Sequence, residues 1–352
     1  MHWYYAMFGF VLCGVALSFE KDERLRRYLQ MLYLPFLLFV LVMFVGLRSA
    51  SPDYNVYSDW FDWASAGQLV AQDWAKDPAF VLVSSIVSAL GISFAGVTLV
   101  FAILTLGSQL YFSTLASDPK WITLFVYLVV CRTLIGSDMA SIRSAVAIPL
   151  MSISVLLAFR GKRKSALLLY IVALTFHLSV LIGLLPFLLV MCRVQFHSRW
   201  WILSVGIVGI VAKGWLQDIV GLLSNSRTEG YIENLNASKG PPSGYYIYIG
   251  IRLLILALIV ILYWNKIGAE SHLALFVFSI GIGLQILFIQ NNALSWRTSD
   301  IFGMFDVVVM MLPLKLTKGY YSLLYAAGLV VFGLALFQFG MKDVEPYRWI
   351  LA

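Results

Sequence analysis

Long apolar runs separated by short charged segments make up most of this chain of 352 residues. Runs of about 20 residues predict helices that cross a bilayer, because that length covers the hydrocarbon core. Such runs lie at 3–19, 28–47, 94–115, 121–135, 141–159, 200–215, 245–264, 273–289, 301–314 and 320–339. A weaker stretch, 78–90, predicts a short re-entrant or interfacial helix. The pattern therefore predicts an all-α, polytopic integral membrane protein with about 10–12 transmembrane helices and short loops, forming a single domain over 1–352.

One apolar run of 28 residues, 165–192, is interrupted by His177 and Pro186. It could cross the membrane once, or it could form two short helices that turn near His177. Each half of such a pair would be only roughly 20 Å long. Short, broken helices are tolerated in a membrane where they line a cavity within the protein. We favour the broken pair, and the choice sets the orientation of the segments that follow.

Composition excludes several classes of protein. Hydrophobic residues make up 61% of the chain and charged residues 12%, about half the charged share of a soluble domain. Too few charges remain to cover a soluble enzyme, a secreted disulfide scaffold or a disordered chain. The net charge of +7 comes mostly from short loops such as 20–27 and 160–164, where basic residues mark the cytoplasmic side. We therefore expect no nucleic-acid partner, and we place the acidic stretch 48–77 outside.

Charged groups inside or at the edge of apolar runs need a reason, because a charge in the bilayer is costly. On the favoured topology Arg48, Arg143, His177 and Arg297 all fall towards the outer side. Snorkelling would also explain Arg48 and Arg143, and a neutral core histidine would also explain His177.

Three further charges lie within the runs, and helix-to-helix ion pairs would explain them: Arg132, Arg252 and Asp306. Few acidic residues lie within the runs to balance the outer arginines. Guanidinium groups pair bidentately with carboxylate and with phosphate, so we expect an anionic ligand, namely a lipid-linked phosphate or diphosphate. In the same cavity His177 could act as a general base.

Other chemistries lack their motifs. The sequence has no phosphate-binding Walker loop, no His-Glu-x-x-His, no Cys-x-x-Cys and no Gly-x-Ser-x-Gly, so we expect no cofactor. Asp59 and Asp62 lack the Asp-x-Asp spacing of metal-dependent transferases. They could still hold a metal together with Asp53 or accept a proton from a sugar, but we expect metal-independent chemistry.

Five short motifs, in this order, resemble the EpsG/Wzy group of bacterial exopolysaccharide and O-antigen polymerases. They are Gly46-Leu47-Arg48 followed by Asp53-Tyr54-Asn55-Val56-Tyr57, then Asp77-Pro78-Ala79-Phe80, then Ile142-Arg143-Ser144-Ala145-Val146-Ala147 before the basic loop 160–164, then Phe176-His177-Leu178-Ser179-Val180, and finally Pro346-Tyr347-Arg348. The chain departs from the family pattern at Ser51-Pro52, where glycines are common, and at Ser144, where Gln is usual.

The resemblance implies a glycosyltransferase at the periplasmic face of the bacterial inner membrane. Such an enzyme moves a growing glycan from undecaprenyl diphosphate onto a lipid-linked oligosaccharide repeat unit, and a separate protein partner sets the chain length. His177 and Arg143 would be catalytic, and Arg48, Asp53, Tyr57 and Arg297 would contact the diphosphate or the glycan. The alternatives are an O-antigen ligase, a flippase or transporter of the same lipid-linked oligosaccharide, and an acyltransferase that modifies polysaccharide.

Overall fold

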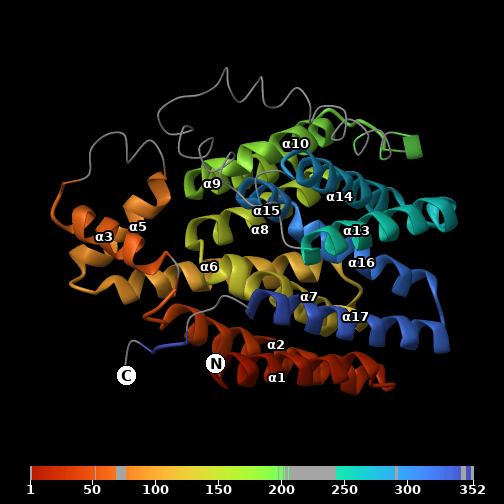
Figure 1. The fold of residues 1–352 in the computed structure, drawn as a ribbon, viewed down its shortest axis with the longest axis horizontal. Helices are drawn as coiled ribbons and strands as arrows, with labels where there is room; N and C mark the ends of the chain where they lie inside the picture. Colours follow the sequence, from red (N-terminus) through yellow and green to blue (C-terminus); the bar gives the residue numbers. More distant parts are fainter. Residues whose placement is uncertain are drawn as a thin grey trace. The chain divides into compact units, whose positions relative to one another are not determined.

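The computed structural model describes residues 2–51, 53–68, 77–196, 198–200, 202, 205, 243–289, 292–341 and 346–349. All of the regular elements within these ranges are helical (Figure 1), so the all-α prediction is confirmed. Eight helical segments are long and apolar enough to cross a membrane: His2–Phe19, Glu23–Gly46, Phe94–Ala116, Pro119–Asp138, Ile142–Phe159, Tyr245–Leu262, Ala269–Leu287 and Tyr320–Gly340. The chain is therefore a multi-pass membrane protein.

These eight segments match eight of the predicted runs. The ninth, 301–314, forms α16 (Gly303–Leu316), whose 14 residues are fewer than a full span needs. The tenth, 200–215, lies almost wholly outside the described residues. The weak stretch 78–90 forms α5 (Pro78–Ala89), a 12-residue helix with proline in its first turn. It is short, as predicted, and proline suits that position because an N–H in the first turn has no acceptor within the helix, so its absence removes no helix hydrogen bond.

The chain divides into two compact units, Met1–Phe187 with Gly319–Ala352, and Leu188–Lys318. The expectation of one domain over 1–352 stays a prediction. The helices of the first unit, besides α5, are α1 (His2–Val15), α2 (Glu23–Gly46), α3 (Tyr54–Ser65), α6 (Phe94–Ala116), α7 (Ile122–Thr133), α8 (Ile142–Phe159), α9 (Arg163–Phe176) and α17 (Tyr320–Gly340), with short 3-10 turns at Ala16–Phe19 (η1) and Pro119–Trp121 (η2) and a π-helical turn at Leu134–Asp138 (η3).

The ends of α2 follow from its sequence. The Asp22 carboxylate accepts hydrogen bonds from the backbone N–H groups of Arg24 (2.8 Å) and Leu25 (3.2 Å), so the helix begins at Glu23. At the other end Gly46 lets α6 approach closely. The Thr98 hydroxyl donates to the Gly46 carbonyl at 2.6 Å, and a Cβ at Gly46 would meet the Leu99 backbone at 2.9 Å.

The 28-residue apolar run is broken at His177, as predicted. Helix α9 ends at Phe176, His177 is extended, and a 3-10 turn η4 (Leu178–Gly183) leads into α10 (Leu184–Met191). The chain folds back on itself here, since the Tyr170 ring stacks on Phe187 with centroids 4.5 Å apart. The Tyr170 hydroxyl also donates to the Val180 carbonyl at 2.8 Å. This bond ties α9 to the 3-10 turn that follows the break.

The second unit contains α13 (Ser243–Leu262), a 3-10 turn η5 (Trp264–Lys266), α14 (Ala269–Leu287), α15 (Asn292–Ile301) and α16. A fully buried ion pair joins two of them: Arg252 Nη2 donates to Asp306 Oδ1 at 2.7 Å. Arg252 Nη1 also donates to the Gln285 and Ser299 side chains, so one guanidinium ties together α13, α14, α15 and α16. The predicted helix-to-helix ion pair is confirmed for Arg252 and Asp306.

Candidate active site

Asp77 lies where three helices of the first unit begin or end. It directly precedes Pro78 at the start of α5. Its carboxylate accepts a hydrogen bond from Arg143 Nη1, in the first turn of α8. The same carboxylate lies beside His177, at the end of α9, with 3.3 Å between Asp77 Oδ1 and His177 Nδ1. Asp77 thus joins two residues that the sequence marked as catalytic candidates.

Two aromatic side chains of α3 hold Arg143 from the other side. The Arg143 guanidinium carbon lies 5.1 Å from the Tyr57 ring centroid and 4.8 Å from that of Trp60, which is the range of a cation–π contact. Arg143 Nε also donates to the Tyr57 hydroxyl at 3.4 Å. Helices α3 and α5 pack against each other (Figure 1), so the carboxylate and the rings approach Arg143 together.

The exposed fraction of the side chain differs among Asp77, Arg143 and His177. The Asp77 side chain is 1% exposed, Arg143 15% and His177 30%. The carboxylate is therefore the buried support, and the histidine is the member that a substrate can reach. With Nδ1 turned to Asp77, the other ring nitrogen, Nε2, is left to accept a proton. A buried carboxylate that orients a histidine also stabilises the imidazolium that forms when it does so.

Arg143 keeps donors for a ligand despite its partners. A guanidinium carries five N–H groups, and the contacts to Asp77 and Tyr57 use Nη1 and Nε. Its charge is offset by Asp77, so it is not the unbalanced cation that the sequence suggested. The cluster is neutral while His177 is neutral and carries one positive charge once His177 takes a proton.

Arg48 is placed differently. It follows α2 and is only 1% exposed, so the snorkelling alternative is wrong for it. Its Nη1 donates to the Val45 carbonyl, its Nε has no hydrogen-bond partner, and within the part of the chain that the structure describes no carboxylate lies within 4.0 Å of it. Burial lowers the pKa of Arg48 to about 10. The guanidinium therefore remains charged at neutral pH, in a place where an unpaired charge is costly.

A C-terminal segment covers Arg48. The backbone of Arg48 pairs with Trp349 in an isolated bridge, and the Ser49 N–H donates to the Arg348 carbonyl at 2.9 Å. The Tyr347 ring stacks on Phe44 with centroids 4.3 Å apart, and its hydroxyl donates to the Phe44 carbonyl at 2.5 Å. The motif Pro346-Tyr347-Arg348 therefore lies against the end of α2.

Helix α3 lies close to both arginines. Burial raises the pKa of Tyr54 and of Tyr57, and the charge of Arg48 opposes the shift at Tyr54 while that of Arg143 opposes it at Tyr57. The two tyrosines are one helical turn apart on the same helix. Asp53 stands at the start of α3, half-buried, where its carbonyl accepts from the Tyr57 N–H at 3.1 Å.

Arg297 belongs to the second unit, on α15, and its side chain is exposed. One face of α15 is anchored: the buried Ser295 hydroxyl donates to the Gln285 carbonyl at 2.6 Å, and the buried Ser299 accepts from Arg252 at 2.7 Å. The structure thus brings His177, Arg143 and Tyr57 together, with Arg48 in the same unit, and places Arg297 in the other.

Within the described residues, no three His, Cys, Asp or Glu side chains lie close enough to hold a metal ion. Asp59 and Asp62 are on the exposed face of α3, away from the buried face that carries Tyr57 and Phe61.

Sequence reasoning gave no role to Asp77 or Trp60. Asp77 was visible only as one of several acidic residues in the outer stretch and as the first letter of a motif. A signal was present, because a carboxylate directly before a helix-starting proline, at the edge of an apolar stretch, has to be paired if it is buried. Nothing local to the sequence shows that its partners are Arg143 and His177.

The family model described as the EpsG family matches residues 31–350, which is 320 of the 352 residues and includes every residue of the cluster. No curated protein and no solved structure matches the chain.

Proposed function

The chain belongs to the EpsG family, and on that premise we propose that it is a polysaccharide polymerase of the bacterial inner membrane. It would transfer a growing glycan from undecaprenyl diphosphate onto the non-reducing sugar of a lipid-linked repeat unit at the periplasmic face. Family membership and the membrane-spanning helices support a polymerase-like membrane protein. The cluster of Asp77, Arg143 and His177 is the observation that carries the proposed chemistry.

His177 is the general base in this proposal. Its Nε2 takes the proton of the acceptor hydroxyl as that oxygen bonds to the anomeric carbon of the donor glycan. The bond from that carbon to the diphosphate oxygen breaks, and its electron pair leaves with the diphosphate. Asp77, 3.3 Å from His177 Nδ1, fixes the ring and stabilises its charged form.

The leaving diphosphate needs cations. Hydrogen-bond donors that are fixed where negative charge develops in the transition state lower the activation barrier. Donors that bind only the ground state do not. Arg143 and His177 contact the same carboxylate, that of Asp77, so Arg143 is a donor close to the proposed base. Its planar guanidinium group can bind two phosphate oxygens at once. Arg48 is a second cation of the same unit, and we assign it to the diphosphate. Arg297, Asp53 and Tyr57 remain candidates for contacts to the diphosphate or glycan.

The remaining parts of the proposal follow from the family. The lipid partner is an undecaprenyl-diphosphate-linked oligosaccharide, and the cluster faces the periplasm. The reaction uses no metal and no cofactor, because proton transfer and cationic stabilisation suffice for a diphosphate leaving group. A chain-length partner would act on the product rather than in the cluster.

Reconstitution tests this function. Purified protein in liposomes is supplied with its lipid-linked repeat unit, and products are separated by size. The proposal predicts a ladder of products, with one undecaprenyl diphosphate released for each unit added. Movement of the lipid across the bilayer with no ladder would instead indicate a transporter. Transfer to a lipid A core acceptor, with no growth of lipid-linked chains, would indicate a ligase.

A further inference from the structure

The guanidinium of Arg48 is a buried cation, and the carboxylate that acts on it is engaged elsewhere. Among the described residues no ion pair includes Arg48. The charge of Asp138 acts on it from a distance, but the Asp138 oxygens accept hydrogen bonds from Gln109 Nε2 at 2.8 Å and Thr133 Oγ1 at 2.9 Å. The buried charge of Arg48 is therefore not neutralised by contact, which is unfavourable.

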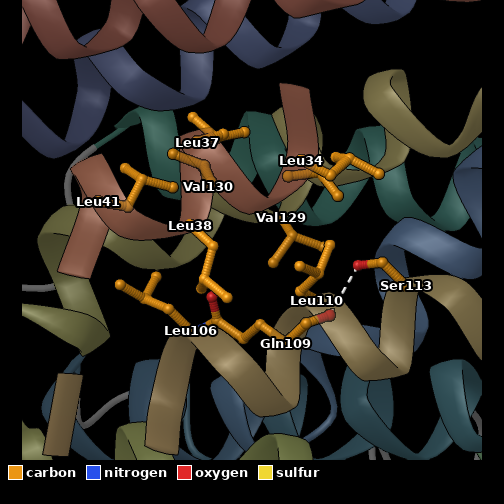
Figure 2. A pocket seen from close by; sticks show the side chains of 11 residues that line it. Leu34, Leu37, Leu38, Leu41, Leu106, Gln109, Leu110, Ser113, Val129 and Val130 are labelled. Carbon is orange, nitrogen blue, oxygen red and sulfur yellow. Dashed lines mark hydrogen bonds between the residues drawn. The ribbon is translucent and has the colours of Figure 1, made fainter. Parts of the chain in front are cut away.

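The helix bundle closes one approach to this guanidinium. A small cavity lies between α2, α6 and α7 (Figure 2) and is lined mostly by leucine and valine. It does not extend to Arg48, because α2 and α6 touch between the two. There the Thr98 hydroxyl donates to the Gly46 carbonyl at 2.6 Å, and a Cβ at Gly46 would meet the Leu99 backbone at 2.9 Å. A ligand for Arg48 therefore has to come from another side.

Residues 346–349, here called the strap, cover Arg48 on another side. Arg48 and Trp349 form an isolated antiparallel bridge. The Ser49 N–H donates to the Arg348 carbonyl at 2.9 Å, and the Ser49 hydroxyl donates to the Trp349 carbonyl at 3.3 Å. The bridge belongs to no sheet of the described residues, so no neighbouring strand supports it.

One side chain anchors the strap. The Tyr347 ring stacks on Phe44 with centroids 4.3 Å apart and meets the Tyr4 ring edge-on at 5.7 Å. Tyr347 is buried, whereas its neighbours Pro346 and Arg348 are exposed. Opening the strap therefore breaks this aromatic packing and the backbone bridge, but no extended ladder of hydrogen bonds.

Two opposing effects act on the strap. Aromatic packing and hydrogen bonds favour the closed form, whereas closing keeps the charge of Arg48 away from water, which favours the open form. One of the five guanidinium N–H groups has its donor atom, Nη1, bound to the Val45 carbonyl, so others remain for an anion. An anion that binds only the open form shifts the balance towards it.

We propose that the strap is a gate over Arg48: it withholds the guanidinium when closed, and a phosphate-bearing anion that binds Arg48 holds it open. Arg48 is 1% exposed in the closed form, so binding and opening are linked. The gate would thus let this cation meet an anionic substrate and keep it covered otherwise. The identity of the anion, the diphosphate of the lipid-linked substrate, rests on the proposed function.

A disulfide that locks the strap tests the gate. Ser49 and Arg348 face each other across the bridge, and the Cα atoms of such a pair are about 5.5 Å apart, which a disulfide can span. Ser49→Cys/Arg348→Cys is made with the three native cysteines replaced by alanine. The two single-cysteine variants are the matched controls. Binding of radiolabelled inorganic diphosphate to the full chain in nanodiscs is measured before and after reduction.

We expect the oxidised pair to bind diphosphate at least 10-fold more weakly than the reduced pair, and the single variants to change less than 2-fold. Arg48→Gln should bind as weakly as the locked protein, and locking the strap in that background should add less than 2-fold. Affinity of the oxidised pair equal to that of the reduced pair would overturn the gate. So would a further loss on locking Arg48→Gln, because the strap would then act on another site.

Hydrogen exchange of the wild-type protein tests the gate without the cysteine pair, should that variant fail to fold or to cross-link. The Ser49 amide, which the closed strap protects, should exchange faster with diphosphate bound, and diphosphate should have no such effect in Arg48→Gln. Unchanged or slower exchange in wild type would contradict the gate. Gated diphosphate binding without polymerisation would count against the proposed function alone, and polymerisation at the wild-type rate by the oxidised pair would count against the gate alone.

Discussion

His177 and Asp77 are 100 residues apart in the chain, and their side chains lie 3.3 Å apart, Nδ1 to Oδ1. The contact depends on two features. The break between α9 and η4 leaves His177 extended, and Pro78 starts α5 directly after Asp77. A histidine within a continuous helix would not meet the carboxylate in this way.

Asp77→Asn tests the orienting role of that carboxylate. The amide keeps the shape but cannot stabilise an imidazolium, so we expect the turnover rate to fall roughly 10²-fold or more. The KM for the lipid-linked repeat unit should change little, because Asp77 is 1% exposed and does not reach substrate. Single-turnover and steady-state kinetics measure both values. A rise in KM with an unchanged rate would assign Asp77 to binding instead.

Activity is expected to depend on the planar, multi-donor guanidinium group of Arg143 as well as on its charge. Arg143→Lys keeps the charge but loses the simultaneous contacts to Asp77 and Tyr57. We expect Arg143→Gln to lower kcat/KM by roughly 10²–10³-fold, the effect of removing one placed donor, and Arg143→Lys to recover only part of the loss. Full activity of the lysine variant would show that only the charge matters.

The buried network of the second unit predicts a large effect on stability. Arg252→Met leaves Asp306 buried without its cation, which costs roughly 3–5 kcal/mol. Thermal unfolding of the purified protein should show this as a clear drop in Tm. Arg193→Met, at an exposed position of the same unit, is the control and should change little.

The double variant Arg252→Met/Asp306→Leu should regain much of the stability lost in Arg252→Met, because it removes both charges together. A double variant as unstable as the single one would mean that packing around Arg252, rather than the charge pair, carries the effect.

Gly46→Ala should loosen the contact that positions Arg48. A Cβ at Gly46 would lie 2.9 Å from the Leu99 Cα, and a backbone cannot move away as a side chain can. We expect a loss of about 1–3 kcal/mol, measured as a lower Tm. Gly107→Ala on α6 is the matched control, since no atom lies within 4 Å of the added Cβ. Equal loss in both variants would contradict close packing at Gly46 as the cause.

The hydrophobic pattern predicted much of the fold because length and apolarity suffice to mark a membrane helix. The break at His177 was also visible, since a histidine and a proline interrupt one run. The number of spans was less predictable: the run 301–314 is apolar, but it is no longer than the 14-residue α16 that it forms, which is fewer residues than a full span needs. A segment can be apolar because it is buried among other helices or because it contacts lipid, so apolarity alone does not show that it spans the membrane.

The candidate site was predictable only in part. Charges within apolar runs pointed to Arg143 and His177, because charge at that depth demands a partner. The partner itself, Asp77, depends on contacts between residues far apart in the chain, which no local spacing encodes. The same limit explains Arg48, whose depth of burial comes from the distant segment 346–349.

The most direct test of the account compares wild type with His177→Gln in the reconstituted polymerisation assay. His2→Gln, at an exposed position, serves as the control, and all three proteins are matched for amount and correct insertion. A product ladder is expected from wild type and from His2→Gln. No growth beyond the single repeat unit is expected from His177→Gln, although the lipid-linked unit still binds. A full-length ladder from His177→Gln would contradict the role of His177 as the general base.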